Sequence, residues 1–224
     1  MPPVVRGAVW YPRIRVDSDA ELLERWVAGD AAAGEALFER YFDAMFRFFR
    51  AKAPMHSRDL VQRTFAACLE KRDTLRDAAS FRAFLYGIAR FEILRLMRRT
   101  TRAAREVDPS ETAIHAFDPS PSVVAVQRQE HRLLAEALRR IPIDLQIAVE
   151  LHYWEELATA EIADVLGVPQ GTVKSRLRRA REALCVVLES LTEDDALVRS
   201  TITGFDGWVR DVKDLLGPDP DDPE

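Results

Sequence analysis

The chain has 224 residues and is 47% hydrophobic, which is enough for one medium domain or two small domains with buried cores. Its 32 Lys and Arg residues against 37 Asp and Glu residues give a formal charge of -5, which by itself argues against a nucleic-acid-binding protein. No segment has the ~20 apolar residues of a membrane span, and the N-terminus lacks the apolar stretch of a signal peptide, so we expect a cytoplasmic protein without membrane insertion.

The first quarter of the chain predicts two helices joined by a tight turn. Ser18 and Glu21 have the spacing of a capping box, so a helix should begin there and end near residue 28. Gly29 then breaks it. A second helix should span about 31–52, because its apolar residues recur at spacings of three and four. These residues are Leu37, Phe38, Tyr41, Phe42, Met45, Phe46 and Phe49.

Two more helices are expected before residue 105. Ser57 should cap one that ends near residue 71, and Ser80 should cap the other. The apolar residues of this last helix also have helical spacing. They are Phe81, Phe84, Leu85, Ile88, Leu94 and Met97. No stretch of the chain alternates polar and apolar residues as a strand would.

Residues 106–121 (EVDPSETAIHAFDPSP) contain three prolines and many small polar residues, which is typical of a linker. Four helices should follow. They span about Ser122–Arg140, Ile143–Tyr153, Thr159–Leu166 and Gln170–Leu188. The short gap between the last two, with Gly167 in the turn, indicates a helix-turn-helix. We therefore predict an all-α fold of two small helical domains on a flexible linker, each with its own core.

The negative total charge hides two basic segments. Seven arginines and one acid lie within 81–105, and five Lys or Arg residues with one acid lie within 170–183. The tail, 192–224, carries ten acids against three bases. Because local charge density rather than net charge sets phosphate binding, both basic segments are candidate nucleic-acid surfaces.

The helix-turn-helix segment, 159–184, predicts a helix that reads duplex DNA. Its apolar positions should hold the second helix against the domain, which leaves polar and basic side chains outside. The start of such a helix enters the major groove, where Gln reads adenine and Lys or Arg reads guanine, and the other cations pair with phosphates. The expected duplex-binding residues are Gln170, Gly171, Thr172, Lys174, Ser175, Arg176, Arg178 and Arg179.

Two parts of the chain resemble the extracytoplasmic-function (group 4) sigma factors of the sigma-70 superfamily. The segment 138–184 is similar to their region 4, above all in GTVKSRL at 171–177. The first half is similar to their region 2, because three segments follow one another in the family's order. These segments are LFERYFDAMFRFFR, DLVQRTFAACLEK and SFRAFLYGIARFEILRLMRR. The resemblance covers about residues 21–188. It implies a subunit that directs core RNA polymerase to promoters and initiates transcription, with no catalysis and no cofactor of its own.

The resemblance also implies roles for individual residues. Asp59 and Gln62 should contact core polymerase, and region 4 should bind the -35 promoter element as duplex. The first-half basic segment should open the -10 element, since aromatics with arginines hold single-stranded DNA by stacking and charge. Its candidates are Phe84, Tyr86, Arg90, Phe91, Arg95, Arg98 and Arg99, of which we expect Tyr86 and Phe91 to be exposed for stacking. Arg63, Phe91 and Arg95 depart from the family pattern.

The predicted organisation has five parts. They are an N-terminal extension (1–17), region 2 (18–105), the linker (106–121), region 4 (122–190) and an acidic C-terminal extension (191–224). Core polymerase and promoter DNA are the expected partners, and the sequence leaves open whether an anti-sigma factor binds. Two alternatives remain at this point: a DNA-binding regulator of the LuxR type, and a sigma-like decoy that only binds proteins.

Neither cysteines nor histidines form a metal-binding pattern. Cys68 and Cys185 lie far apart among apolar residues, and the four histidines are scattered, so we expect buried free thiols and no metal. The acidic extension carries an apolar stripe from Val198 to Leu216, and we expect Phe205 and Trp208 to be partly buried.

Overall fold

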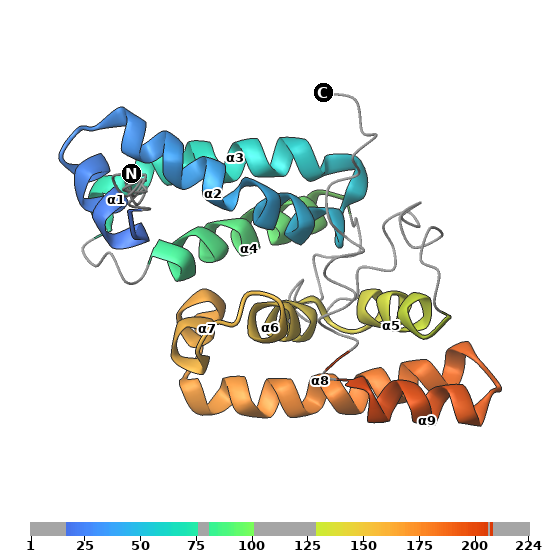
Figure 1. Cartoon of the computed structure of the whole chain (residues 1–224). Helices are drawn as coiled ribbons and strands as arrows, with labels where there is room; N and C mark the ends of the chain where they lie inside the picture. Colours follow the sequence, from blue (N-terminus) through green and yellow to red (C-terminus); the bar gives the residue numbers. More distant parts are fainter. Residues whose placement is uncertain (1–16, 76–80, 101–128, 206, 208–224) are drawn as a thin grey trace, which may run out of the picture.

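The computed structural model describes residues 17–75, 81–100, 129–205 and 207 of the chain. The regular elements of this described part are helices, as predicted. In chain order they are α1 (Asp19–Val27), α2 (Ala31–Arg50), η1 (Pro54–His56), α3 (Ser57–Lys71), η2 (Arg72–Thr74), α4 (Phe81–Thr100), α5 (Gln129–Arg140), α6 (Ile143–Tyr153), α7 (Thr159–Leu166), α8 (Gln170–Leu191) and α9 (Asp195–Thr203). They form two layers, α1–α4 above α5–α9 (Figure 1).

The first two helices begin as their sequences predict. The Ser18 hydroxyl accepts a hydrogen bond from the Glu21 backbone N–H, and the Glu21 carboxylate accepts one from the Ser18 N–H, so the capping box is confirmed. Gly29 makes the turn to α2 with φ +102°, a backbone conformation that residues with a Cβ rarely adopt. The predicted cap of α3 is wrong, because Ser57 is already helical and its hydroxyl donates to the Pro54 carbonyl oxygen.

Aromatic contacts hold the upper layer together. Phe38 of α2 meets Trp26 of α1 edge-to-face, with ring centroids 5.4 Å apart, and stacks on Phe65 of α3 at 4.6 Å. Phe48 joins α2 to α4 through an edge-to-face contact with Tyr86 at 5.5 Å. These aromatic contacts therefore hold three helices, α1, α3 and α4, against α2. The predicted cap of α4, at residue 80, lies outside the described residues.

The lower layer contains the helix-turn-helix. The chain turns between α7 and α8 at Gly167, which is left-handed at φ +65°. Buried residues from α5, α6, α8 and α9 form one cluster behind this unit. They include Leu134, Leu138, Leu145, Val149, Leu184, Leu188, Val198 and Phe205. The boundaries of α6 and α7 agree with the prediction, and α8 extends to Leu191, three residues beyond it.

The start of the C-terminal extension packs on α5 and α8 in the way a small core requires. Asp194 caps α9 by accepting from two backbone N–H groups. Phe205 is buried, as predicted, against the ring of Tyr153 at 5.7 Å. Ile202, on the expected apolar stripe, is exposed. Trp208, the rest of the stripe, the linker 106–121 and the N-terminal extension to residue 16 lie outside the described residues.

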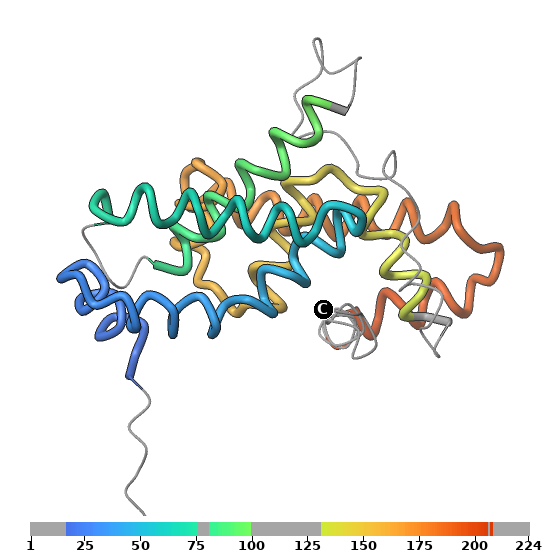
Figure 2. Tube along the Cα trace, turned by 90° about the horizontal axis from the view of Figure 1, so that it is seen from above, coloured from blue at the N-terminus to red at the C-terminus, as the bar shows by residue number. Residues whose placement is uncertain are grey.

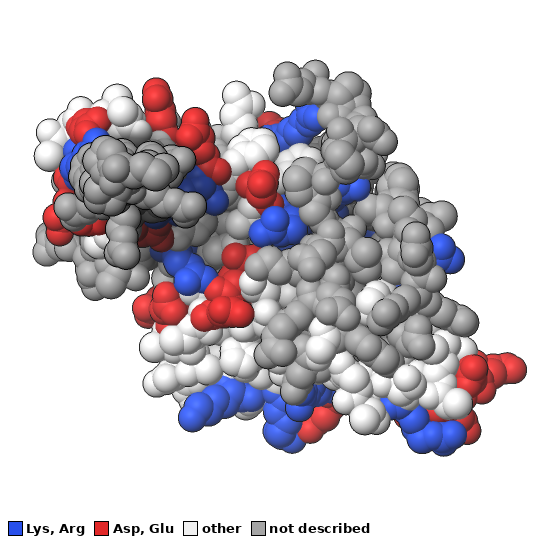
Figure 3. All heavy atoms as spheres, viewed as in Figure 1, with Lys and Arg blue, Asp and Glu red and all other residues white. Residues whose placement is uncertain are grey.

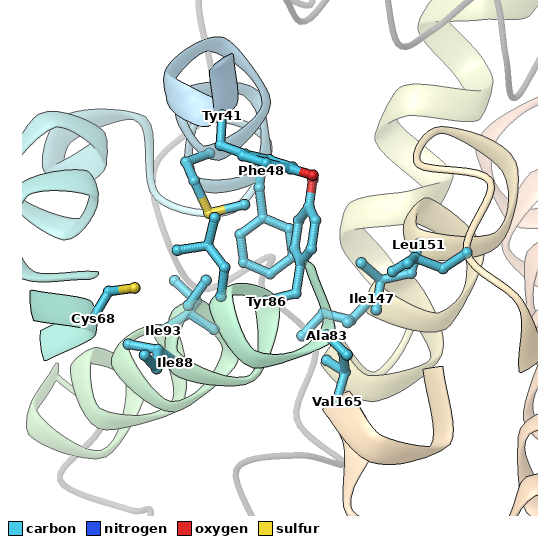
Figure 4. Packing of buried hydrophobic residues seen from close by; sticks show 14 of the residues in the cluster. Tyr41, Phe48, Cys68, Ala83, Tyr86, Ile88, Ile93, Ile147, Leu151 and Val165 are labelled. Carbon is cyan, nitrogen blue, oxygen red and sulfur yellow. The ribbon is translucent and has the colours of Figure 1, made fainter. Parts of the chain in front are cut away.

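The expectation of two separate cores is wrong. One hydrophobic cluster runs from the upper layer into α6, α7 and the start of α8. Ala83 and Ile88 of α4 share it with Ile147 of α6 and Val165 of α7 (Figure 4). Seen from above, the two layers overlap (Figure 2). Sequence patterns do not reveal this, because an apolar residue has the same spacing whether it packs within its own layer or against the other layer.

Two glycines in helices give a matched test of the upper layer. A Cβ at Gly34 would lie 2.4 Å from the buried Trp26 indole nitrogen, whereas a Cβ at Gly87 would meet nothing within 4 Å. We predict that Gly34→Ala lowers the free energy of unfolding by about 1–3 kcal/mol through overpacking. Gly87→Ala should raise it by about 0.5–1 kcal/mol through helix propensity. Urea unfolding followed by circular dichroism measures both, and equal effects would contradict the close approach of α1 and α2.

Candidate nucleic-acid interface

The recognition helix α8 is held by a row of buried apolar side chains. Val173, Ala180 and Leu184 face the core from α8. Ile162 and Leu166 bury the matching face of α7. This burial fixes the rotation of α8 about its axis, and with it the side chains presented to solvent.

The outer face of α8 carries most of the predicted duplex-binding residues. Exposed side chains are those of Gln170, Lys174, Ser175, Arg178 and Arg179, with Gly171 exposed and Thr172 half-buried. In the space-filling view, basic atoms gather along the lower edge, over α8 (Figure 3). Gln170 donates to the Thr159 hydroxyl at 2.8 Å, and Arg178 pairs with Glu182 at 2.7 Å. These exposed groups lie on one surface that could meet a groove and its phosphates.

Arg176 is not on that outer face. Its guanidinium donates at 2.7 Å to a carboxylate oxygen of Asp144, the second residue of α6, which is itself 4% exposed. The same carboxylate accepts two hydrogen bonds from Arg90 of α4, at 2.8 and 2.9 Å. Arg90 and Arg176 were predicted for two different DNA surfaces, yet the structure brings them together on one acid.

The exposed face of α4 carries the remaining predicted residues of the first DNA surface. Phe91 is 53% exposed, and Arg95, Arg98 and Arg99 are exposed beside or beyond it along the helix. Arg95 lies 3.7 Å from the buried carboxylate of Glu92. Phe91 therefore has the exposure that stacking against a base requires.

The prediction that Tyr86 is exposed for stacking is wrong. Its side chain is 0% exposed and packs edge-to-face on Phe48 (Figure 4). Burial raises the pKa of its hydroxyl well above the usual value. The cause is that α4, in the upper layer, packs against α2 through Phe48, against α3, and also against α7 of the lower layer, so little of its first half is left for solvent. Phe84 is half-buried.

A pocket that sequence reasoning missed opens beside these α4 residues. Its volume is about 460 Å³. Its walls come from α4, the end of α3 with the following turn, and α7. They include Phe84, Gly87, Ile88 and Phe91 of α4, Lys71 and Leu75, and Asp164 of α7. The spacing of the α4 residues, three and four apart, was visible in the sequence, but the contribution of α7 was not.

The two predicted polymerase-binding residues lie on the exposed side of α3. Asp59 and Gln62 are both exposed, while Leu60 and Val61 are buried beneath them. Arg63, which departs from the family pattern, donates to both carboxylate oxygens of Asp59 at 2.9 Å. This difference from the family pattern therefore pairs a cation, Arg63, with Asp59, the acid that was expected to contact core polymerase.

The described residues show neither a membrane-spanning helix nor a group of three or more side chains suited to a metal ion. Cys68 is buried, and burial raises the pKa of its thiol to about 12. Cys185 is half-buried rather than buried, and burial is the main cause that raises its pKa. Both thiols are therefore protonated at neutral pH and poorly nucleophilic.

Comparison with known proteins agrees with this geometry. The family model "Sigma-70 region 2" matches residues 37–103, and "Sigma-70, region 4" matches residues 131–184. The ECF RNA polymerase sigma factor SigM of Mycobacterium tuberculosis is 31% identical over 195 residues, covering 84% of this chain and 94% of SigM. The ECF RNA polymerase sigma-E factor of Escherichia coli is 29% identical over 176 residues, covering 75% and 92%.

A solved structure shares the fold. CnrH, in complex with the cytosolic domain of CnrY, aligns with a TM-score of 0.53 and 23% identity. The alignment covers 79% of this chain and 100% of that one.

The outer face of α8 can be tested without knowing a target sequence. We predict that Arg178→Ala with Arg179→Ala weakens binding to any duplex, because both side chains are exposed and the Arg178–Glu182 pair, being in solvent, is weak enough to give way to a phosphate. The slope of log K against log salt should flatten by about 1.8, or about 0.9 per lost contact. The matched control removes two arginines from the other layer, Arg25→Ala with Arg40→Ala. If the slope of log K against log salt changed equally for the two double variants, the outer face of α8 would be ruled out as the duplex-binding surface.

Proposed function

The chain belongs to the extracytoplasmic-function sigma factors of RNA polymerase, and from this membership we propose which of its residues carry each step. As such a factor it directs core polymerase to specific promoters and initiates transcription, with core polymerase and promoter DNA as its partners. Sigma factors are generally initiation factors rather than enzymes. We place its action in the cytoplasm, where polymerase and promoters meet.

We propose that α8 binds the -35 element as duplex DNA. The observation that carries this assignment is the helix-turn-helix, whose recognition helix exposes Lys174, Arg178 and Arg179 on one face. Gln170 at the first turn is placed to reach base edges. Arg176 joins this set only when its contact with Asp144 is broken.

The exposed part of α4 is the proposed site for the -10 element. Phe91 offers a ring for base stacking, and Arg95, Arg98 and Arg99 offer charge to the backbone. The neighbouring pocket is lined mainly by apolar residues, among them the aromatic rings of Phe84 and Phe91, together with the charged Lys71, Glu92 and Asp164. Aromatic rings in its lining suit a base taken out of its stack. Tyr86 is not part of this proposal.

The proposed contact with core polymerase is the exposed side of α3 around Asp59 and Gln62. A regulator of the LuxR type would need only α7 and α8, and would leave the match of residues 37–103 to sigma region 2 without a role. A decoy that binds proteins alone would leave the basic faces of α4 and α8 without one. The sigma role uses all three surfaces.

Transcription in vitro is the direct test of this function. Core polymerase supplemented with the purified chain should start transcripts from a subset of promoters in a genomic library, and core polymerase alone should not. Promoter-specific starts that disappear with Arg178→Ala and Arg179→Ala would link them to α8. A chain that binds duplex DNA but never yields transcripts with core polymerase would favour the LuxR-type alternative.

The polymerase contact makes a separate prediction. Asp59→Ala with Gln62→Ala should weaken binding to core polymerase by about 1–2 kcal/mol, or roughly 5- to 30-fold. The fold should be unchanged, because both side chains are exposed. Titration of labelled core polymerase measures the affinity. Glu70→Ala, an exposed acid at the far end of α3, is the control, and an unaltered affinity of the double variant would remove this surface from the proposal.

A further inference from the structure

A side-chain hydrogen bond joins the first turns of the two helices of the helix-turn-helix. The amide nitrogen of Gln170, at the start of α8, donates at 2.8 Å to the hydroxyl oxygen of Thr159, at the start of α7. Gln170 is one of the residues expected to bind duplex DNA, and its side chain is exposed. Thr159 was not among those residues, and it is half-buried.

The backbone that carries Thr159 is fixed relative to α8. The start of α7 is closed by a hydrogen bond of 2.7 Å from the Ala158 N–H to the Glu161 carboxylate. The turn at Gly167 and the buried apolar faces of α7 and α8 then set the distance between the two helix starts. Thr159 therefore offers its hydroxyl to Gln170 from a position that the packing of the two helices determines.

The bond leaves a defined set of polar groups on Gln170. A glutamine amide has two N–H donors and one carbonyl oxygen. Thr159 takes one N–H, so one N–H and the oxygen Oε1 remain available together. One donor beside one acceptor is the pair with which glutamine binds N7 and the N6 amino group of adenine in the major groove. The side chain has also given up part of its rotamer freedom before it meets DNA, which lowers the entropy lost on binding.

We propose that Gln170 reads one adenine of the -35 duplex and that Thr159 is its positioning residue. The inference rests on the proposed function, because it takes α8 as the helix that binds this element. Thr159 acts only through Gln170, by holding its amide in one orientation. Without the Thr159 hydroxyl the amide can turn over, and its N–H groups then suit O6 of guanine or O4 of thymine equally well. Thr159 thus sets which base is preferred at one position of the promoter.

The test uses the holoenzyme, in which the full chain is bound to core polymerase. A promoter found by transcription in vitro supplies the duplex, with its -35 region randomised, and sequencing of the bound duplexes gives the base preference at each position. Gln170→Ala identifies the position that this residue reads, where the preference for adenine should fall about tenfold. Thr159→Val keeps the shape of the side chain without its hydroxyl. It should lower the preference about fivefold at that position and at no other.

Three further variants separate positioning from a structural role. Thr159→Ser restores the hydroxyl and should restore the preference for adenine. Thr203→Val makes the same chemical change at an exposed position at the end of α9, so it is the matched control and should alter no position. Thr159→Val added to Gln170→Ala should have no further effect, because the hydroxyl acts through the amide. A further loss in this double variant would count against the positioning role.

The outcomes also distinguish this inference from the sigma role. The positioning role is overturned by an unaltered adenine preference in Thr159→Val, by an equal loss at every position, or by a loss that Thr159→Ser does not restore. A guanine or thymine preference at the position identified by Gln170→Ala overturns the reading of adenine. These results leave the sigma function standing, since the unaltered holoenzyme still selects a promoter. If the unaltered chain selects no sequence with core polymerase, the proposed function fails and this inference fails with it. A loss confined to one adenine, restored by Thr159→Ser, supports the proposal.

Discussion

The Asp144 carboxylate is the point at which the two layers and the two proposed DNA surfaces meet. It sits in the first turn of α6, where a negative charge is favoured by the helix dipole. Around it α6 is buried along almost its whole length, from Ile143 to Leu151. A helix buried on every side must be covered by neighbours in all directions. The neighbours of α6 include α5, α7 and α8, and Arg90 of α4 reaches its first turn. The position of α6 thereby brings Arg90 and Arg176 to one acid.

The local chemistry of the chain was predictable, because it depends on residues close in sequence. Ser18 with Glu21 identified the start of α1, and Gly167 identified the turn before α8. The exposed positions of α8 followed from its apolar spacing. Apart from the cap of α3 at Ser57, what failed depended on distant segments. Tyr86 has the sequence surroundings of a surface aromatic, and only the packing of α4 against Phe48 of α2 and against α7 shows why it is buried.

The same distinction applies to charge. Composition gave a net charge of -5, and segregation along the chain explained how a DNA-binding protein can be acidic overall. Which charged side chains form ion pairs in the folded chain is a separate question. Arg63 neutralises Asp59 one turn away on α3, which spacing alone could suggest. Lys52 and Glu150, 98 residues apart, form a buried pair that spacing could not reveal.

That buried pair also bears on how firmly the layers hold together. Burial lowers the pKa of Lys52 and raises the pKa of Glu150, while each partner's charge opposes these shifts. An interface of apolar residues alone, such as Ile147 with Ala83, would favour packing of the two layers without an opposing cost. The charges of Lys52 and Glu150 lose hydration when the layers pack, and this loss offsets part of the apolar gain. An interface that mixes both kinds of contact therefore holds the two layers together less firmly than a wholly apolar interface of the same size would.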